Sequence, residues 1–365
     1  MTVSMPTPRR TRPSIEAWTF SDEELAEAQA GARLLNPSLD LSNACNLNCS
    51  FCFVEDLASS AKTRRPGELT LAESLAVVDD FASAGARTVN LVGAGEPTID
   101  PHFLEIVRRI HSHGMRTMLF TNGIAIARNP LLARQLASLD VSVCLKLNSR
   151  DPERQDRIVG RQGYARQRDA ALDALLAAGL ASGRPSRLGV DVLVIQETLS
   201  EIPTLYTWCI EANIFPLLAE YIPTGRTAGG AKPLAPFDDS AMSRLSREQR
   251  VALAERLAEI DQCHGLSASP ATCAYFGGTV CTQLLGVYVD IMGRVWPCVA
   301  RTQVHANGMA ATHEPLGSVR TTGQTAALLW SSHPYMAFLR TTYNGRCPYK
   351  LAIPPIDTSD SCDGA

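Results

Sequence analysis

The segment Cys45-Asn46-Leu47-Asn48-Cys49-Ser50-Phe51-Cys52 places three cysteines, separated by three and two residues, directly after an apolar run that ends at Asn43. This short spacing lets three sulfurs approach one another on a loop. An iron–sulfur cluster is normally held by four thiolates, so a group of three leaves one iron open to bind a substrate or cosubstrate. Structural zinc is the alternative, but it needs a fourth ligand, and no second Cys-x2-Cys pair follows in the sequence. The segment therefore favours an iron–sulfur site over zinc.

Short apolar runs alternate with amphipathic stretches on either side of this segment. The runs predict six strands, at residues 39–43, 88–92, 116–121, 141–147, 189–195 and 216–222. Helices are expected between them; before one of them, Thr70 and Glu73 fit a capping box. Parallel strands need helical return connections. We therefore expect an α/β fold, a partial (βα)6 barrel over residues 38–261.

Polar residues stand where several predicted strands end, which is where a βα barrel carries its chemistry. Candidates for binding a cofactor or substrate are Asn122, Asn148, Ser149 and Gln196. Glu220 and Tyr221 lie at the end of the sixth strand and are candidate catalytic bases. Each of these side chains has a second interpretation as a helix cap, a core-edge residue or a solvent contact.

The Cys-x3-Cys-x2-Cys motif after a first strand, with the aromatic Phe51 before its last cysteine, resembles the signature of the radical S-adenosylmethionine (SAM) enzymes. The resemblance implies that Cys45, Cys49 and Cys52 hold a [4Fe–4S] cluster whose open iron binds SAM. Reductive cleavage of SAM would then give a 5′-deoxyadenosyl radical that abstracts a hydrogen atom. An external one-electron reductant such as flavodoxin or ferredoxin is implied as a partner.

A second motif, Gly93-Ala94-Gly95-Glu96-Pro97, follows the second predicted strand and resembles the Gly-Gly-Glu-Pro of the same enzymes, with Ala94 as the departure. Gly93 and Gly95 are expected to let the backbone approach the methionyl end of SAM, and Glu96 to help hold its ammonium group. A dinucleotide-binding Gly-x-Gly-x-x-Gly would need a glycine where Thr98 stands. The motif therefore argues against a nicotinamide cofactor.

Residues 262–365 hold six of the eleven cysteines and predict a smaller α+β domain. Residues 287–298 alternate in polarity around Gly293, which predicts a β-hairpin. This hairpin resembles the auxiliary-cluster domains of radical SAM enzymes, called SPASM when large and Twitch when reduced. The resemblance implies one auxiliary [4Fe–4S] cluster, with the ligands Cys281, Cys298, Cys347 and either Cys362 or Cys273. Zinc on the same cysteines stays open as an alternative.

The composition is that of an ordinary globular protein, with 45% apolar residues, 19% charged residues and a net charge of -3. This balance gives no reason to expect a nucleic-acid partner or an anionic membrane. No apolar run reaches the ~18–20 residues of a membrane span, and the first twenty residues lack the apolar core of a signal peptide. We therefore expect a cytoplasmic protein. Residues 1–37 predict an N-terminal extension with one short helix beginning near Ser21, and Cys144 and Cys209 are expected to be buried thiols.

Three reactions fit these features. The first is dehydrogenation of a small polyhydroxylated metabolite, an aminocyclitol or amino sugar of antibiotic biosynthesis, with Glu220 or Tyr221 taking the hydroxyl proton. The alternative is maturation of a ribosomally made peptide by thioether formation, crosslinking or epimerisation. Only about forty residues precede Cys45, so a separate leader-binding protein is expected in that case. The third reaction is radical epimerisation of a sugar, with a cysteine as hydrogen donor. We take dehydrogenation as the leading prediction.

Overall fold

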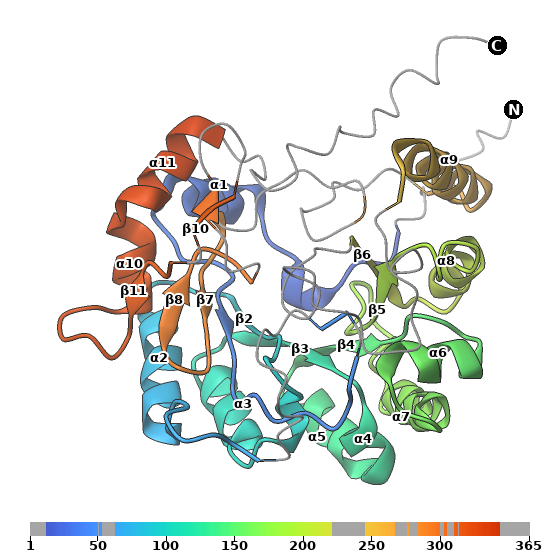
Figure 1. The fold of residues 1–365 in the computed structure, drawn as a ribbon, viewed down its shortest axis with the longest axis horizontal. Helices are drawn as coiled ribbons and strands as arrows, with labels where there is room; N and C mark the ends of the chain where they lie inside the picture. The colour runs from blue at the N-terminus through green and yellow to red at the C-terminus, as the bar shows by residue number, and fades with distance from the viewer. Residues whose placement is uncertain are drawn as a thin grey trace, which may run out of the picture.

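The computed structural model describes residues 12–49, 51–52, 63–220, 245–266, 276, 284–299, 303–304, 310–312 and 314–343. Six parallel strands form its centre: β1 (Ser38–Leu39), β2 (Thr88–Leu91), β3 (Arg116–Thr121), β4 (Val141–Lys146), β5 (Leu188–Val194) and β6 (Phe215–Glu220). The connecting helices are α2 (Leu71–Ser83), η2 (Pro97–Ile99), α3 (Phe103–Ser112), α4 (Ile124–Arg128), α5 (Leu131–Ser138), α6 (Pro152–Val159), α7 (Tyr164–Ala177) and α8 (Ile202–Glu211). These helices cover the outer face of the curved sheet (Figure 1).

The strands belong to a nine-stranded sheet in the order β11-β8-β7-β1-β2-β3-β4-β5-β6. Among the described residues, β6 pairs only with β5, so the sheet curves without closing. The predicted partial (βα)6 barrel is thereby confirmed. The strand at 116–121 has the predicted bounds, whereas β1 is shorter than the predicted 39–43. Beyond β1, the Asp40 N–H still donates to Val289 O at 2.9 Å, whereas the Asn43 N–H donates to the Glu68 carboxylate at 3.0 Å.

Alternation along the strands separates an outer core from the inner face of the barrel. In β4, Val141, Val143 and Leu145 pack in the main hydrophobic core under the helices. Cys144, between them, points to the opposite face, where it packs with Met118 and Leu217. The predicted burial of Cys144 and Cys209 is confirmed, since both are buried. The capping box of Thr70 and Glu73 is also present at the start of α2.

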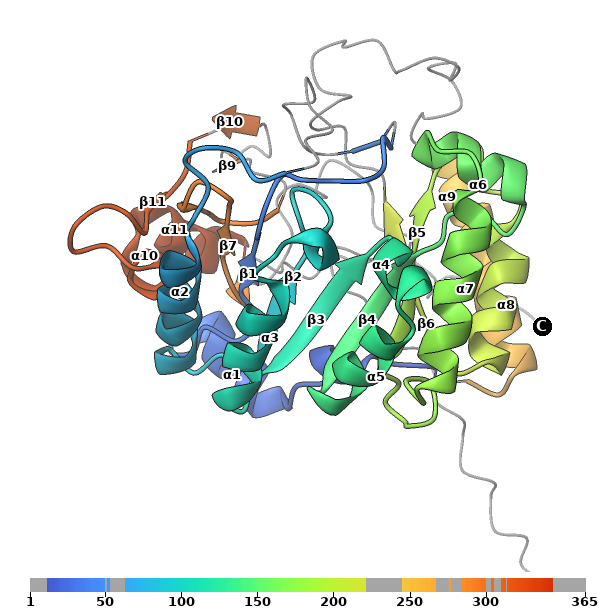
Figure 2. The same cartoon turned by 90° about the horizontal axis from the view of Figure 1, so that it is seen from below.

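The N-terminal segment closes the end of the barrel opposite the carboxyl ends of the strands (Figure 2). It contains η1 (Glu16–Trp18) and the predicted helix at Ser21, which is α1 (Asp22–Ala30). Ile15 and Ala17 are buried with the inner-face residues of the barrel. The Trp18 indole donates to Asn90 Oδ1 at 2.8 Å and lies 5.9 Å from the Phe120 ring. Part of the predicted N-terminal extension is therefore core of the barrel.

The C-terminal segment continues the same sheet. The predicted hairpin is confirmed as β7 (Tyr288–Val289) and β8 (Arg294–Trp296), with Gly293 in the left-handed region at φ 78°. Strand β7 pairs in parallel with β1, through Ser38 opposite Tyr288. The Asp290 carboxylate accepts hydrogen bonds from the backbone of Met292 and from the Trp296 indole, which stabilises the turn. Three short strands, β9 (Gln303–Val304), β10 (Ala310–Thr312) and β11 (Gly317–Ser318), follow.

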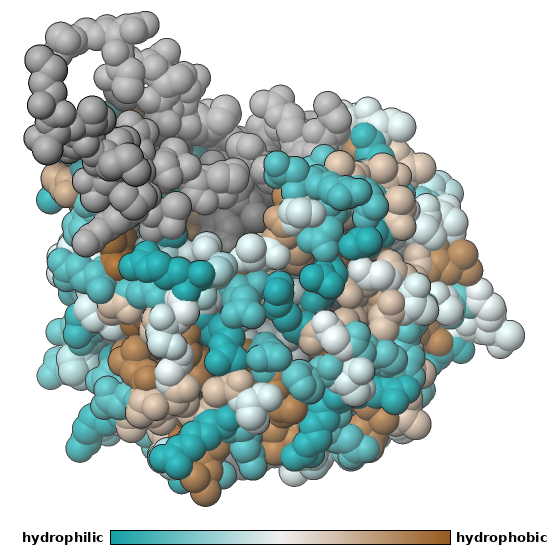
Figure 3. All heavy atoms as spheres, turned by 180° about the vertical axis from the view of Figure 1, so that it is seen from behind, coloured by the Kyte–Doolittle hydropathy of each residue, from teal (hydrophilic) through white to brown (hydrophobic). Residues whose placement is uncertain are grey.

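Three further helices complete the described part of the chain: α9 (Arg247–Cys263), α10 (Ala326–Ser332) and α11 (Pro334–Tyr343). The last two of these helices are separated by the single residue His333. Pro334 causes the division, because a proline disfavours the helical conformation of the residue before it. The predicted boundary between residues 261 and 262 falls just inside the end of α9. None of the described helices has the length and apolar character needed to cross a bilayer. On one face of the molecule, hydrophilic and hydrophobic residues are mixed over the described surface (Figure 3).

Replacing Trp18 by alanine should lower the free energy of unfolding by about 2–4 kcal/mol, because the change removes a half-buried aromatic ring and its hydrogen bond to Asn90. Denaturant unfolding of the purified chain measures the effect. The matched control is Glu23→Ala on the exposed side of α1, which should change the value by less than about 0.5 kcal/mol. Equal stability of the two variants would contradict the inserted position of the N-terminal segment.

The ion pair of Glu73 with Arg320 joins α2 to the C-terminal segment, with a Nε–Oε1 distance of 2.7 Å. Its hydrogen bonds from Arg320 lower the pKa of Glu73 to about 2 from 4.5. A lowered pKa stabilises the fold above pH 4.5, and the contribution is lost as the pH falls from 4.5 to 2. Because the pair is exposed to solvent, Glu73→Gln, which leaves the hydrogen bonds from Arg320 to Gly67 O and Glu68 O in place, should cost at most about 1 kcal/mol at pH 7. The thermal midpoints of variant and wild type should converge toward pH 2; a gap that persists there would contradict this assignment.

Candidate active site at the carboxyl ends of the strands

The loop that carries the first cysteines, residues 44–49 and 51–52, is called the cysteine loop. It follows β1 and crosses the end of the barrel toward which the arrowheads of β3 and β4 point (Figure 2). Leu47, which is buried, anchors the loop in a small apolar cluster of its own. The other buried members of this cluster are Ile124, Ile158, Val159 and Tyr164, from α4, α6 and the start of α7. Cys45, Cys49 and Phe51 pack against the same cluster, so the loop is held by the helices of the barrel.

Backbone contacts fix the loop further. The Asn48 N–H donates to Val159 O at 3.1 Å, and the Arg161 guanidinium donates to Asn46 O at 2.7 Å. Gly160 has φ 64°, and a Cβ added there would lie 2.7 Å from Asn48 O. A side chain at this position would therefore push the loop away from the end of α6.

A cluster of charged side chains holds the base of the cysteine loop. Arg64 donates to the carbonyl oxygens of Leu41 and Leu69 and pairs with Asp100, whose side chain is fully buried. Glu68 accepts from the Asn43 N–H at 3.0 Å and lies 3.7 Å from Arg64 Nε. The buried carboxylates are thus compensated by a guanidinium and a backbone donor. The start of the loop is tied to the segment before α2.

The three thiols of the loop are half-buried, and none forms a disulfide. Burial raises the pKa of the Cys45 thiol to about 12, so a thiolate here needs a compensating cation. Among the described residues, no three His, Cys, Asp or Glu side chains are grouped closely enough to hold one metal ion. A tetrahedral zinc ion would need its sulfurs about 2.3 Å from one centre, whereas each thiolate of an iron–sulfur cluster binds a different iron. Three thiols on one loop are the kind of donor set that such a cluster takes.

Glu96 lies at the end of β2, nearly fully buried, between the cysteine loop and β3. Its carboxylate accepts from the Thr121 hydroxyl at 2.6 Å, from the Asn122 N–H at 2.7 Å, and from the N–H and hydroxyl of Thr98. Burial raises the pKa of Glu96, and these four hydrogen bonds act in the opposite direction. The Glu96 N–H donates to Ala44 O at 2.7 Å. In this structure Glu96 thus joins three strand ends, and the predicted contact with an ammonium group stays a prediction.

The glycines of the same segment are required by close packing. A Cβ on Gly95 would lie 2.0 Å from Ala44 O, and one on Gly93, which has φ 86°, would lie 2.5 Å from Gly95 O. Ala94, the departure from the family pattern, is buried without such a restriction. The two glycines therefore let the end of β2 approach the cysteine loop, and their predicted approach to the methionyl end of SAM stays a prediction.

At the end of β4, Asn148 and Ser149 are fully buried. Their backbone N–H groups both donate to Gln155 Oε1, at 2.8 and 3.0 Å, and Arg168 donates to Ser149 O at 2.9 Å. The side-chain amide nitrogen of Asn148 is buried and has no hydrogen-bond partner among the described residues. A buried donor of this kind costs free energy until an acceptor meets it. The predicted contact of Asn148 with a cofactor stays a prediction.

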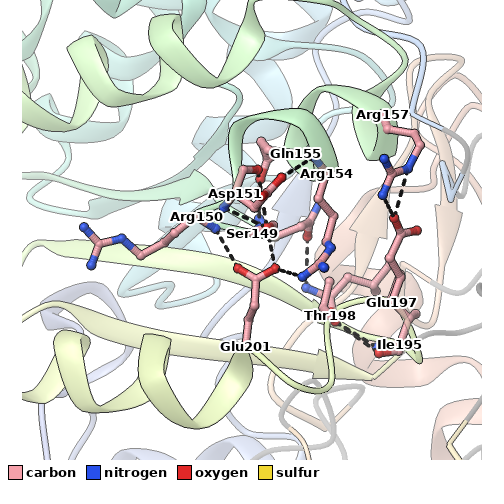
Figure 4. A network of polar contacts seen from close by, with 12 residues as sticks. Ser149, Arg150, Asp151, Arg154, Gln155, Arg157, Ile195, Glu197, Thr198 and Glu201 are labelled. Carbon is pink, nitrogen blue, oxygen red and sulfur yellow. Dashed lines mark hydrogen bonds and ion pairs between the residues drawn. The ribbon is translucent and has the colours of Figure 1, made fainter.

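The carboxylates that follow β5 belong to a polar network with α6 (Figure 4). The Ser149 hydroxyl donates to Glu201 at 2.6 Å, and Arg154 pairs with the same carboxylate. Arg157 donates to Glu197 Oε1 at 2.7 Å, while the other oxygen of Glu197 is buried without a partner among the described residues. Gln196, predicted to bind a cofactor, exchanges hydrogen bonds with Gln249 of α9.

Phe51 of the cysteine loop contacts the inner face of the barrel, where two charged residues lie. The ring of Phe51 contacts Leu193 and Ile195. Lys146 Nζ lies 4.7 Å from the centre of this ring and 2.8 Å from Asp191 Oδ2. Lys146 is one of the polar residues that the sequence places at the end of a predicted strand, facing SAM or substrate hydroxyls, whereas Asp191, inside the fifth predicted strand, is not identified from the sequence. Their opposite charges at facing positions of neighbouring predicted strands were the available signal.

Several predicted site residues lie outside the described residues: Tyr221, Cys273, Cys281, Cys347 and Cys362. The backbone of Glu220 ends β6, but its side chain is not described. Cys298 follows β8, half-buried and without a disulfide. The auxiliary-cluster ligands and the two catalytic bases therefore remain predictions. The anchoring roles of Leu47, Arg161 and Tyr164 are not predicted from the sequence. Their contacts join the cysteine loop to segments that are distant from it in the sequence.

Comparison with known proteins agrees with this geometry. Residues 39–209 match the model of the Radical SAM superfamily. Among curated proteins, the chain is similar to the mycofactocin maturase MftC of Mycobacterium ulcerans, 29% identical over 261 residues, which is 71% of this chain and 66% of that protein. It is also similar to the sporulation killing factor maturation protein SkfB of Bacillus subtilis, 29% identical over 294 residues, with coverage of 78% and 66%. The matched region is thus slightly under two thirds of either relative.

Among solved structures, the chain resembles Streptococcus suis SuiB bound to its precursor peptide SuiA. The TM-score is 0.61 at 16% identity, and the alignment covers 90% of this chain and 74% of that one. The likeness at this identity shows a common fold. It confirms the predicted architecture of a partial barrel, while the division at residues 261 and 262 stays a prediction.

Leu47→Ala should release iron from the reconstituted protein to a chelator at least about tenfold faster than wild type. Truncating a buried leucine costs about 2–5 kcal/mol, and part of this cost falls on the docking of the loop that carries the three thiols. The absorbance of the iron–chelator complex over time gives the rate. Leu176→Ala, at a leucine that is 40% exposed on α7, is the matched control. Equal release from both variants would show that Leu47 does not anchor the loop.

Proposed function

We propose that this chain, whose residues 39–209 match the Radical SAM superfamily, is a radical SAM maturase that modifies a peptide substrate. The observation that supports this proposal is the pair of curated relatives, since both are named as maturases and both align over more than two thirds of this chain. The dehydrogenation of an amino sugar, which the sequence analysis ranked first, has less support. Maturation of a ribosomally made peptide, the alternative to dehydrogenation, is therefore the function proposed.

Cys45, Cys49 and Cys52 would hold the [4Fe–4S] cluster, and the rim of the barrel beside them would hold SAM. When bound, these groups supply a one-electron cleavage that produces a hydrogen-abstracting adenosyl group. The chain itself contributes position and exclusion of water. Leu47 docks the cysteine loop, and Glu96 fixes the ends of β2 and β3 against it. The buried amide of Asn148 offers a donor for a cofactor hydroxyl.

The apolar surroundings of the loop serve the same reaction. Leu47, Ile124, Ile158 and Val159 are all nearly fully buried beside the half-buried thiols of Cys45 and Cys49. A site of this kind keeps bulk water away from a reactive group. The inner face of the barrel continues from Phe51 toward Lys146 and Asp191, so a substrate would meet both apolar and charged side chains.

The auxiliary cluster is part of the proposal. Cys298 follows the hairpin of β7 and β8, which is joined to β1 of the barrel. Together with Cys281, Cys347 and either Cys362 or Cys273, it would ligate one further [4Fe–4S] cluster. An external reductant such as flavodoxin or ferredoxin would supply the electron for SAM cleavage.

The reconstituted protein with SAM and dithionite should form 5′-deoxyadenosine, and Cys45→Ala should reduce this product at least about 100-fold, because the loss of one thiolate ligand destabilises the cluster. Chromatography with mass spectrometry measures the product. In the same reaction, synthetic peptides encoded by the short reading frames beside the gene should change in mass. Formation of 5′-deoxyadenosine without a change in any peptide would contradict the maturase proposal and leave the radical SAM assignment intact.

Iron analysis tests the auxiliary cluster. Wild type should bind about eight irons, and Cys281→Ala combined with Cys298→Ala should bind about four. Cys209→Ala, at a buried thiol of α8, is the control and should retain the wild-type iron content. Four irons in both wild type and the double variant would remove the auxiliary cluster from the proposal.

A further inference from the structure

Lys146 and Asp191 face each other on the inner wall of the barrel. They are direct partners in the pairing of β4 with β5. Val143 and Leu145 of β4 and Val190 and Val192 of β5 belong to the outer core, so the alternation directs Lys146 and Asp191 inward. The side chains of Lys146 and Asp191 are 16% and 19% exposed, so both groups are accessible from the inside of the barrel.

The inner wall around this pair is mainly apolar. Met118, Cys144 and Leu217 form the buried layer toward the N-terminal segment, and Leu193 lies toward the cysteine loop. Removing two charges from water costs free energy that their attraction does not always repay, and apolar pairs of similar size are often as stable. Stability alone therefore gives a poor account of an ion pair at this place.

The pair lies close to the site of chemistry. The ammonium of Lys146 is 4.7 Å from the ring centre of Phe51, the neighbour of Cys52. The Tyr164 hydroxyl, in the cluster that anchors the cysteine loop, donates to Lys146 O at 3.0 Å. A substrate that reaches the open end of the barrel beside the loop would therefore come within reach of Lys146 and Asp191.

Resting on the maturase function, we infer that Lys146 and Asp191 together bind a side-chain hydroxyl of the peptide substrate. The hydrogen bond between Lys146 Nζ and Asp191 Oδ2 uses one of three ammonium donors and one carboxylate oxygen. A hydroxyl can accept from the ammonium and donate to the carboxylate, so it satisfies both groups at once. The site then stays neutral. A substrate carboxylate or ammonium would leave an uncompensated charge in this wall.

The test is the affinity of a peptide series for the SAM-loaded, unreduced holoenzyme, measured by calorimetry. The series contains the synthetic peptides encoded beside the gene. It also contains versions with each serine, threonine or tyrosine replaced by alanine, valine or phenylalanine, and versions with each carboxylate converted to an amide. Loss of the recognised hydroxyl should weaken binding to wild type about tenfold or more, as expected for a hydrogen bond to charged groups. The double variant Lys146→Met, Asp191→Leu should bind the parent peptide as weakly and should not discriminate between the versions.

The double variant removes both charges, so it leaves no orphaned ion, and its iron content and melting temperature verify folding. Arg150→Met is the matched control, because this cation lies over Trp208 of α8, 4.7 Å from the ring centre. The Arg150→Met variant should bind the parent peptide with the same affinity as wild type. A tenfold loss of affinity when a carboxylate is amidated, and not when a hydroxyl is removed, would overturn the inference. It would also be overturned if the double variant still distinguished peptides with and without the hydroxyl, or if wild type bound no peptide. Hydroxyl-dependent binding without any change in peptide mass would refute the maturase function alone.

Discussion

The buried carboxylate of Glu96 is the interaction on which the arrangement of the candidate site depends. It accepts four hydrogen bonds, from Thr98, Thr121 and Asn122, while its own N–H donates to the cysteine loop at Ala44. Burial of an ionised group is costly unless donors surround it. The same donors therefore stabilise the charge and bring the ends of three strands together. Gly95 is part of this constraint, since any side chain there would collide with Ala44 O.

Further contacts of the site extend from the residues that bond to Glu96. Asn122, held by Glu96, donates through its side chain to Asn46 in the cysteine loop at 2.7 Å, and its carbonyl accepts from Tyr164. Tyr164 also bonds to Lys146 O, so the loop, the end of β4 and α7 form one connected unit. The thiols thus lie on a segment whose backbone is held at several points, although the loop has no regular secondary structure. Such support is needed, because a site on a loop is otherwise positioned less precisely than one on a helix or strand.

The sequence predicted the barrel well because its signals are local. The short apolar run within 116–121 and the capping box of Thr70 and Glu73 each depend on neighbours in the chain, and the predicted strand and cap are both present in the structure. The position of the three cysteines after the first strand could likewise be predicted from the sequence. The anchoring of Leu47 by α4 and α6 could not be, because that contact exists only after the chain folds. Glu96 was identified as a site residue, but its hydrogen bonds to Thr121 and Asn122 could not be read from a motif.

The inner face of the barrel shows how one set of strands meets two requirements. Toward the N-terminal segment, Ile15, Ala17 and Met118 fill the space with apolar side chains and supply stability. Toward the cysteine loop, the same face changes to Lys146 and Asp191, which add little to stability because their desolvation opposes their attraction. A gradient from apolar to charged along β4 therefore separates the part of the wall that maintains the fold from the part that a substrate would contact. The change occurs within two residues, between Cys144 and Lys146, which is the shortest step that strand alternation allows on one face.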